Sequence, residues 1–297
     1  MSSQGIVLGA KVPNSGPLPA RIGIGTMAAG LEGAGFESLW VSDHVVMPAQ
    51  VESYYPFAAD GRPTWASDTP YYDAIVAMTL IAAATIRARI GPAVLVLPQR
   101  EPVVLAKQLA SLDALSGGRV ELGVGAGWLA EEFAALDVPF ESRGSRFVEW
   151  IQLMRDCWTG DPQAHDGRHY TLPAGILTRP VPAHRIPLLI GGHSPVALKR
   201  AGTIADGWLA HQAAPALDVD ALASGHAAMQ AAAAQAGLDP DPLRVVLRII
   251  ESAGRAAEIA VALPALRDAG VDEIIVDVDW DRSEGPEEAF AALAGSA

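Results

Sequence analysis

The chain has 297 residues, of which 50% are hydrophobic and 19% are charged, and its formal net charge is −13. This composition permits a large buried core and excludes an intrinsically disordered protein. The lysines stand far apart, at Lys11, Lys107 and Lys199, so the sequence offers no basic stripe for nucleic acid, which requires clustered cations.

Disulfide-stabilised, metal-binding and membrane proteins are not expected either. Cys157 is the sole cysteine, which excludes an intrachain disulfide and predicts a buried, inert thiol. The histidines are scattered and do not predict a metal site. The N-terminal residues lack a signal-peptide pattern, and the longest apolar run, Ala74–Ile86, is shorter than the roughly 20 residues that span a bilayer. We therefore expect a cytoplasmic enzyme without a membrane partner.

Along the chain, short runs rich in β-branched residues alternate with longer runs rich in alanine and leucine. The short runs predict eight strands, at Gly5–Val12, Ser38–Ser42, Ile90–Leu97, Val120–Val124, Pro187–Ile190, Gly207–Ala210, Leu243–Ile250 and Glu273–Asp279. The longer runs predict helices at Met27–Gly35, Asp73–Ala88, Pro102–Leu115, Ser145–Trp158, Pro195–Gly202, Leu217–Gly237, Arg255–Gly270 and Glu287–Ala294. Several strands are continuously apolar, which is typical of a parallel sheet buried on both faces.

This alternation predicts a single (β/α)8 barrel over residues 1–297, and an open doubly wound sheet is the alternative. Two long loops interrupt the rhythm, Pro48–Tyr72 after the second strand and Thr159–Arg185 before the fifth. Long loops in a compact domain are usually functional, so we expect both at or near the active face. In such a barrel the chemistry lies at the C-terminal ends of the strands.

The first candidate residues, Asp43 and His44, directly follow the second strand. Their position predicts that both side chains lie over the barrel mouth. A histidine there can donate or accept a proton because it titrates near neutral pH. The alternative is a loop histidine with a structural aspartate partner.

Two further candidates follow the third and fourth strands. A planar ring could lie against the run Gly91–Pro98, although the spacing of this run is more typical of an ordinary core strand. In Gly123–Trp128 the glycines would let a ligand approach the backbone closely, and the alternative is a tight turn. Glu131 and Glu132 come next, and either one faces the site or both belong to a solvated first turn of a helix.

The run Gly191-Gly192-His193-Ser194 lies between the fifth strand and a helix that starts with Pro195. Free backbone N–H groups at a helix start form an anion site, and barrels often bind phosphate on late loops of this kind. Ser194 can cap the helix and also contact a phosphate oxygen. A plain glycine-rich turn is the alternative, and His193 alone fits a loop residue better than a ligand.

Several motifs in one order carry a resemblance to a known family. They are Trp40-Val41-Ser42-Asp43-His44, the run from Leu112 to Trp128, Glu131-Glu132-Phe133, Arg143-Gly144, Asp166-Gly167 with Tyr170, Gly191-Gly192 with Ser194-Pro195, and Asp206-Gly207-Trp208. Together they resemble the luciferase-like oxidoreductases. The pattern is most similar to the branch that depends on coenzyme F420.

The resemblance implies specific roles for these residues. Asp43 and His44 would lie beside the cofactor ring, with His44 as the proton donor or acceptor. Ala93 and Val94 would form the bulge that backs the ring, often with a cis peptide. Gly125, Ala126, Gly127 and Trp128 would line the cofactor channel, while Gly191, Gly192 and Ser194, with His193 beside them, would hold the phosphate. A homodimer is also implied.

One departure from the family bears on the substrate. Some relatives carry an acidic residue where Trp128 stands, so oxidation of a sugar phosphate is not favoured here, and whether Glu131 replaces that acid stays open. Three functions remain: an F420-dependent oxidoreductase acting on a small organic substrate, a monooxygenase that uses FMN, and a non-catalytic cofactor-binding protein. The aromatic residues Tyr54, Tyr55, Trp65, Tyr71 and Tyr72 suggest a partly apolar substrate.

Overall fold

A computed structural model describes residues 5–56, 58, 60–63, 65–281 and 285–297. Its main sheet is parallel throughout and has the strand order β3-β2-β1-β11-β10-β9-β8-β5-β4. The strands are β1 (Val7–Lys11), β2 (Ser38–Val41), β3 (Arg89–Pro92), β4 (Leu95–Val96), β5 (Leu122–Gly125), β8 (Leu188–Gly191), β9 (Gly207–Ala213), β10 (Arg244–Ile250) and β11 (Glu273–Val276). The fold is the predicted (β/α)8 barrel, and the doubly wound alternative is wrong.

The third strand of the barrel is divided into β3 and β4, which are the two ends of the sheet. Because they follow one another in the chain, they bring these ends together and close the barrel. The first part pairs with β2, and the second part pairs with β5. A further bridge joins Ile90 to Val120, just before β5. The peptide bond between Ala93 and Val94, which lie between the two parts, is cis, as the resemblance implied.

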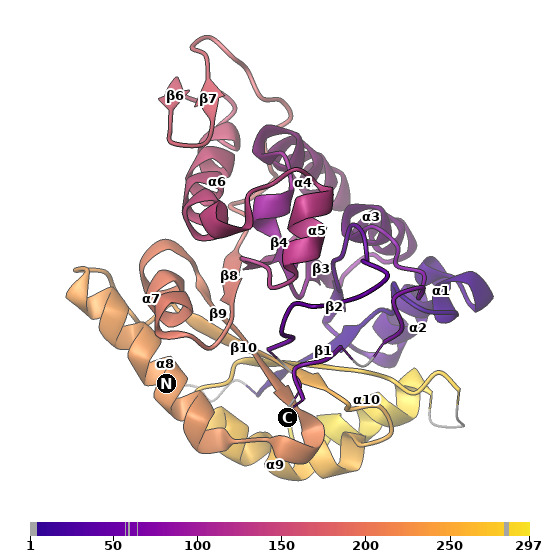
Figure 1. The fold of residues 1–297 in the computed structure, drawn as a ribbon. Coiled ribbons are helices and arrows are strands. Elements are labelled where there is room, and N and C mark those ends of the chain that lie inside the picture. Colours follow the sequence, from indigo (N-terminus) through magenta and orange to yellow (C-terminus); the bar gives the residue numbers. More distant parts are fainter. Residues whose placement is uncertain (1–4, 57, 59, 64, 282–284) are drawn as a thin grey trace.

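Helices cover the outside of the strands, as Figure 1 shows. They are α1 (Leu18–Arg21), α2 (Ile24–Ala34), α3 (Ala74–Ala84), α4 (Pro102–Ser116), α5 (Ala130–Ala135), α6 (Arg143–Cys157), α7 (Pro195–Ile204), α8 (Val219–Gln235), α9 (Ala256–Asp268) and α10 (Pro286–Ala294). Local chemistry sets several ends. The Asp73 side chain accepts hydrogen bonds from the N–H groups of Ile75 and Val76, and α4 ends at Gly117, whose φ of 77° suits glycine.

The sequence did not predict three short elements, α1, α5 and a hairpin. The hairpin joins β6 (His165–Asp166) to β7 (Thr171–Leu172) within the second long loop. In Figure 1 it lies beside α6, away from the barrel strands. Glu149 of α6 accepts hydrogen bonds from the backbone N–H groups of His169 and Tyr170, which fixes the loop to the outside of this helix.

Side chains that point into the barrel form layers because they alternate along each strand. At the N-terminal ends of the strands, Arg89 and Arg244 each bond both Glu121 and Glu273, with N–O distances of 2.7–2.8 Å. The next layer is apolar and consists of Trp40, Leu189, Leu209, Val246 and Ile275. This layer is the floor beneath the cavity at the C-terminal end.

Candidate active site

A cavity of about 630 Å³ opens at the C-terminal ends of the barrel strands. It lies where the fold rule places the chemistry of such barrels. All twelve predicted site residues line it: Asp43, His44, Ala93, Val94, Gly125, Ala126, Gly127, Trp128, Gly191, Gly192, His193 and Ser194. The first long loop also contributes, with Tyr55, Pro56, Trp65 and Tyr71, whereas no residue of Thr159–Arg185 lines the cavity. The second loop therefore supplies no wall of the cavity, although its Tyr170 bonds Glu101, the N-cap of α4, which follows the third barrel strand.

His44 is held by a buried carboxylate that the sequence did not single out. Its Nδ1 atom lies 3.0 Å from Oε2 of Glu132, which is 1% exposed. Oε1 of the same glutamate accepts hydrogen bonds from the N–H groups of Val45 and Val46. Burial favours the neutral acid, but the bonds to His44 and Val45 outweigh it and lower the pKa of Glu132. An ionised carboxylate only accepts, so Nδ1 donates and Nε2 is left to exchange a proton.

Aromatic rings surround the imidazole of His44. Its centroid lies 5.3 Å from that of Tyr71, 6.0 Å from that of Trp65 and 6.1 Å from that of Trp128. Tyr55 contacts both Trp65 and Trp128 edge to face, at 5.3 and 5.0 Å. These rings shield the imidazole from water and provide apolar surface beside it.

Glu131 has a different role from its neighbour, since it anchors the first long loop. Its carboxylate accepts hydrogen bonds from the N–H groups of Glu52 and Ser53 and from the Ser53 hydroxyl, at 2.5–2.9 Å. Partial burial opposes ionisation, but the Ser53 and backbone hydrogen bonds lower the pKa of Glu131 to about 2. Glu131 is thus bonded to the loop and is not among the residues that line the cavity. The expectation of a solvated first helical turn is wrong for buried Glu132.

Asp43 lines the cavity, but both of its carboxylate oxygens have protein partners. The N–H of Val96 donates to Oδ2 at 2.9 Å, and Arg100 donates to Oδ1 at 2.6 Å. Arg100 also bonds Asp73, the capping residue of α3, at 2.9 Å. Burial raises the pKa of Asp43, although the Arg100 charge opposes the shift. These contacts join β2, β4 and α3 and so fix the segment that carries His44.

Val94 occupies space that glycines on the two neighbouring strands leave free. A Cβ atom added to Gly125 would lie 2.8 Å from its Cγ2, and one added to Gly191 would lie 2.8 Å from its Cγ1. Real Cβ atoms do not approach other atoms this closely. Alanine at either position would therefore displace the Val94 side chain into the cavity, which is a reason for glycine on β5 and β8.

The turn after β8 has the features of an anion site. Ser194 caps α7 by accepting a hydrogen bond from the N–H of Ala197 at 3.2 Å, as the sequence predicted. Gly192 has a φ of 116°, which only glycine adopts readily, and its carbonyl accepts a hydrogen bond from Trp208 Nε1 at 2.8 Å. His193 Nε2 accepts from the N–H of His211 at 3.2 Å. The first-turn N–H of Val196 has no partner within the helix and is available to an anion.

Sequence reasoning missed the charged and polar side chains on the opposite strands. Lys11, His211 and Arg248, from β1, β9 and β10, line the cavity. Arg248 pairs with Asp277, which follows β11. A signal was present, since Lys11 and Arg248 are charged residues within otherwise apolar strands, where a charge has to be explained.

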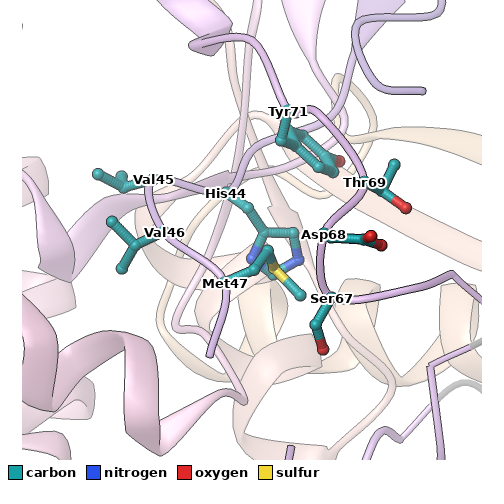
Figure 2. Close-up of a pocket in the computed structure, with 8 residues that line it drawn as sticks. All are labelled: His44, Val45, Val46, Met47, Ser67, Asp68, Thr69 and Tyr71. Carbon is teal, nitrogen blue, oxygen red and sulfur yellow. The ribbon is translucent and has the colours of Figure 1, made fainter. Parts of the chain in front are cut away.

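A second, smaller pocket of about 190 Å³ lies on the other side of His44. Figure 2 shows it between the segment that carries His44, Val45, Val46 and Met47 and the segment that runs from Ser67 to Tyr71. His44 and Tyr71 line both this pocket and the main cavity. The imidazole therefore belongs to the wall between the two spaces.

Comparison with known proteins agrees with the barrel and its site. A family model described as luciferase-like monooxygenase matches residues 10–289, and the chain belongs to this family. It is accordingly an oxidoreductase enzyme, as the sequence predicted. An uncharacterised protein of Mycobacterium tuberculosis (strain ATCC 25618 / H37Rv) is 33% identical over 276 residues, which cover 88% of this chain and 86% of the relative.

Two other relatives are described by a cofactor. An F420-dependent glucose-6-phosphate dehydrogenase of Amycolatopsis mediterranei (strain U-32) is 35% identical over 183 residues, or 60% of this chain and 50% of the relative. A solved F420-dependent secondary alcohol dehydrogenase, in complex with an F420–acetone adduct, superposes with a TM-score of 0.78 at 18% identity. This superposition covers 98% of this chain and 99% of that one, and at this identity it shows a shared fold. Within the described ranges, no helix has the length and apolar character to cross a membrane.

Proposed function

We propose that this enzyme uses coenzyme F420 to move a hydride to or from a small organic substrate, with His44 as the group that handles the proton. One observation carries the proposal. A single cavity is lined on one side by the turn Gly191–Ser194, in which Ser194 caps α7, and on another side by His44, which the buried Glu132 holds from behind. The F420-dependent relative with 35% identity supports the choice of cofactor.

The cavity fits an elongated cofactor with a phosphate and a flat ring. Gly192 and Ser194 would hold the phosphate with the first-turn N–H groups of α7, which suit an anion. The ring would lie against Val94, since the glycines beside it leave the wall low enough for close approach. Gly125, Ala126, Gly127 and Trp128 would line the channel between these two points.

The residues divide the chemistry with the cofactor. When bound, F420 supplies the ring carbon that takes or gives the hydride. Nε2 of His44 would accept the proton from the substrate oxygen during oxidation and return it during reduction. Glu132 would stabilise the positive imidazole in the first case, because its carboxylate lies 3.0 Å from Nδ1. Asp43, whose oxygens are both occupied, would act as a positioning residue.

FMN is the alternative cofactor, since a solved monooxygenase of similar fold, at 14% identity and a TM-score of 0.73, is described as a complex with FMN. Separate titrations of the purified protein with F420 and FMN, followed by fluorescence, distinguish the two. We expect F420 to bind more tightly than FMN. Tight binding of FMN without a response to F420 would reject the proposal in favour of the monooxygenase. Binding of F420 without turnover of any alcohol or carbonyl substrate would favour the non-catalytic carrier.

A matched pair of variants tests the phosphate site. Gly192→Asp places a negative side chain at the proposed anion site, so we expect F420 affinity to fall below detection. Gly175→Asp is the control, because Gly175 also has a positive φ, of 78°, but lines no part of the cavity. Equal F420 affinity in the two variants would remove the phosphate site from this turn. A homodimer and a cytoplasmic location also remain proposals, to be tested by light scattering and by cell fractionation.

A further inference from the structure

Lys11 is a cation inside the cavity that the proposed reaction does not use. It is the last residue of β1 and lines the cavity. Ala10 pairs with Val276, the last residue of β11, so the strand register places Lys11 beside Asp277, the next residue. Burial lowers the pKa of Lys11 to about 8, so most molecules keep the charge at neutral pH.

The carboxylate of Asp277, whose charge acts on Lys11, is already engaged by other groups. Arg248 donates to its Oδ1. The Ser252 hydroxyl lies 3.3 Å from its Oδ2 and accepts the Asp277 N–H at 2.7 Å. The backbone of Lys11 pairs with Trp40 of β2, but its ammonium group forms no hydrogen bond or ion pair with the described residues. Arg248 and Asp277 thus offset one another, and the charge of Lys11 is left in excess.

The carboxylates on the other side of the cavity already have protein partners. Asp43 bonds Arg100, and Glu132 bonds His44. His211 adds no positive charge, since burial and the nearby Arg248 lower its pKa to about 3. In a protein of net charge −13, the described cavity wall on β1 and β10 therefore carries a local positive excess. An uncompensated charge in a partly desolvated cavity attracts an ion of opposite sign.

This positive group is separate from the proposed phosphate site. In sheet order, β1 and β8 are separated by β11, β10 and β9, so the two anion-binding positions lie on different walls. The aromatic residues Tyr55, Trp65 and Tyr71 line the same cavity as Lys11. The space beside Lys11 is thus bounded by a cation on one side and apolar rings on another.

We infer that Lys11 binds a carboxylate of the substrate, and that the substrate is an organic acid with an aromatic or otherwise apolar body. This inference rests on the proposed function, because it assigns the part of the cavity that the cofactor would leave free. The ammonium would donate a charge-assisted hydrogen bond to the carboxylate, with Arg248 behind it reinforcing the positive field. The aromatic rings would contact the body of the acid.

Benzoate and benzamide form a matched pair of probes, equal in shape and different in charge. Their binding to the purified protein can be measured by calorimetry and by quenching of Trp65 and Trp128, which line the cavity. We expect benzoate to bind at least about 10-fold more tightly than benzamide, as a charge-assisted contact implies. Lys11→Met should remove this preference and leave benzamide binding unchanged. Equal affinities in the wild type, or an undiminished preference in Lys11→Met, would overturn the inference.

Control variants and the cofactor separate the possible failures. Lys107→Met should keep the preference for benzoate, because Lys107 lies on α4 and bonds the carbonyl of Arg179 outside the cavity. Lys11→Arg keeps the charge and should keep part of the preference, which covers the case that Lys11→Met does not fold. F420 affinity should be the same in Lys11→Met and wild type. If F420 fails to bind the wild type, the proposed function is wrong while the benzoate result still tests Lys11.

Discussion

Nδ1 of His44 lies 3.0 Å from Oε2 of Glu132, and both side chains are less than 10% exposed. The histidine follows β2 and the glutamate lies in α5, so the pair exists only in the folded barrel. This contact fixes the orientation of the imidazole, and under the proposed function Nε2 would be the atom that exchanges the proton.

Substitutions of the pair should lower turnover to different degrees. His44→Ala removes the proton-transferring group, and we expect kcat to fall by about 10²–10⁴-fold. Glu132→Gln keeps the size of the side chain but loses the charge that stabilises the imidazolium, so we expect a fall of about 10-fold and an altered pH profile of kcat. Steady-state kinetics between pH 5 and pH 9 (about two units either side of neutral) measure both effects. An unchanged pH profile in Glu132→Gln would contradict the positioning role.

Glu131→Gln should loosen the first long loop without altering the His44 contact. The loss of three hydrogen bonds from Glu52 and Ser53 should expose the peptide bonds near Tyr54 and Tyr55 to chymotrypsin. Cleavage should be faster in this variant than in Glu132→Gln at neutral pH. Similar rates in the two variants would show that Glu131 does not anchor the loop.

The same anchor predicts a pH dependence in the wild type. The pKa of Glu131 is about 2 in the fold and starts from 4.5, so ionised Glu131 stabilises the loop above pH 4.5. This stabilisation is lost as pH falls from 4.5 toward 2. Hydrogen exchange of residues 48–56 should therefore accelerate over this window, relative to the barrel strands. Glu131→Gln should show no such acceleration, because its side chain does not titrate.

Gly191→Ala tests the packing of Val94. The added methyl group would meet Val94 Cγ1 at 2.8 Å, and we expect a loss of about 1–3 kcal/mol in the free energy of unfolding, as in other overpacked sites. F420 affinity should fall too, because the displaced valine enters the cavity. The double variant Gly191→Ala with Val94→Ala should recover much of both losses, since the two sites are in contact. Strictly additive losses in denaturation and binding would argue against this account.

The buried ionic layer at the opposite end should affect stability alone. Arg244→Met leaves Glu121 and Glu273 with one guanidinium in place of two, and breaking a buried network of this kind costs about 3–5 kcal/mol. F420 affinity should stay unchanged, because the apolar layer separates these residues from the cavity. Arg21→Met removes an exposed ion pair with Asp281 and should cost less than about 1 kcal/mol. Thermal and chemical denaturation measure the contrast.

The barrel could be predicted from sequence because its strands are apolar on both faces and are separated by helices. Strand β9 runs three residues beyond its predicted end at Ala210, and β11 ends three residues before Asp279. His211 and Gln212 extend β9 because they pair with Arg248 and Ile249 of β10, a contact that no local pattern records. The hairpin β6–β7 was missed for the same reason, since its two-residue strands depend on Glu149 of α6.

Predicted site residues came from strand ends and glycine turns, and all of them line one cavity. Glu132 was not assigned because the choice between it and Glu131 depends on the direction of α5, which is set by tertiary packing. Lys11 was missed because the candidates were sought at strand ends and glycine turns, whereas its signal is a charge within an apolar strand. The roles of Asp43, His44 and the glycines, the homodimer and the cytoplasmic location stay predictions.

The split third strand has one more consequence. The four residues from Pro92 to Leu95 form the junction between β3 and β4, where the barrel closes. Val94, one of these four residues, also packs at the wall of the cavity. A substitution that alters the cavity at this junction therefore also affects the closure of the barrel. Variants with altered ligand preference should be easier to obtain on β1 or β10, whose neighbours remain hydrogen-bonded along their length, than at this junction.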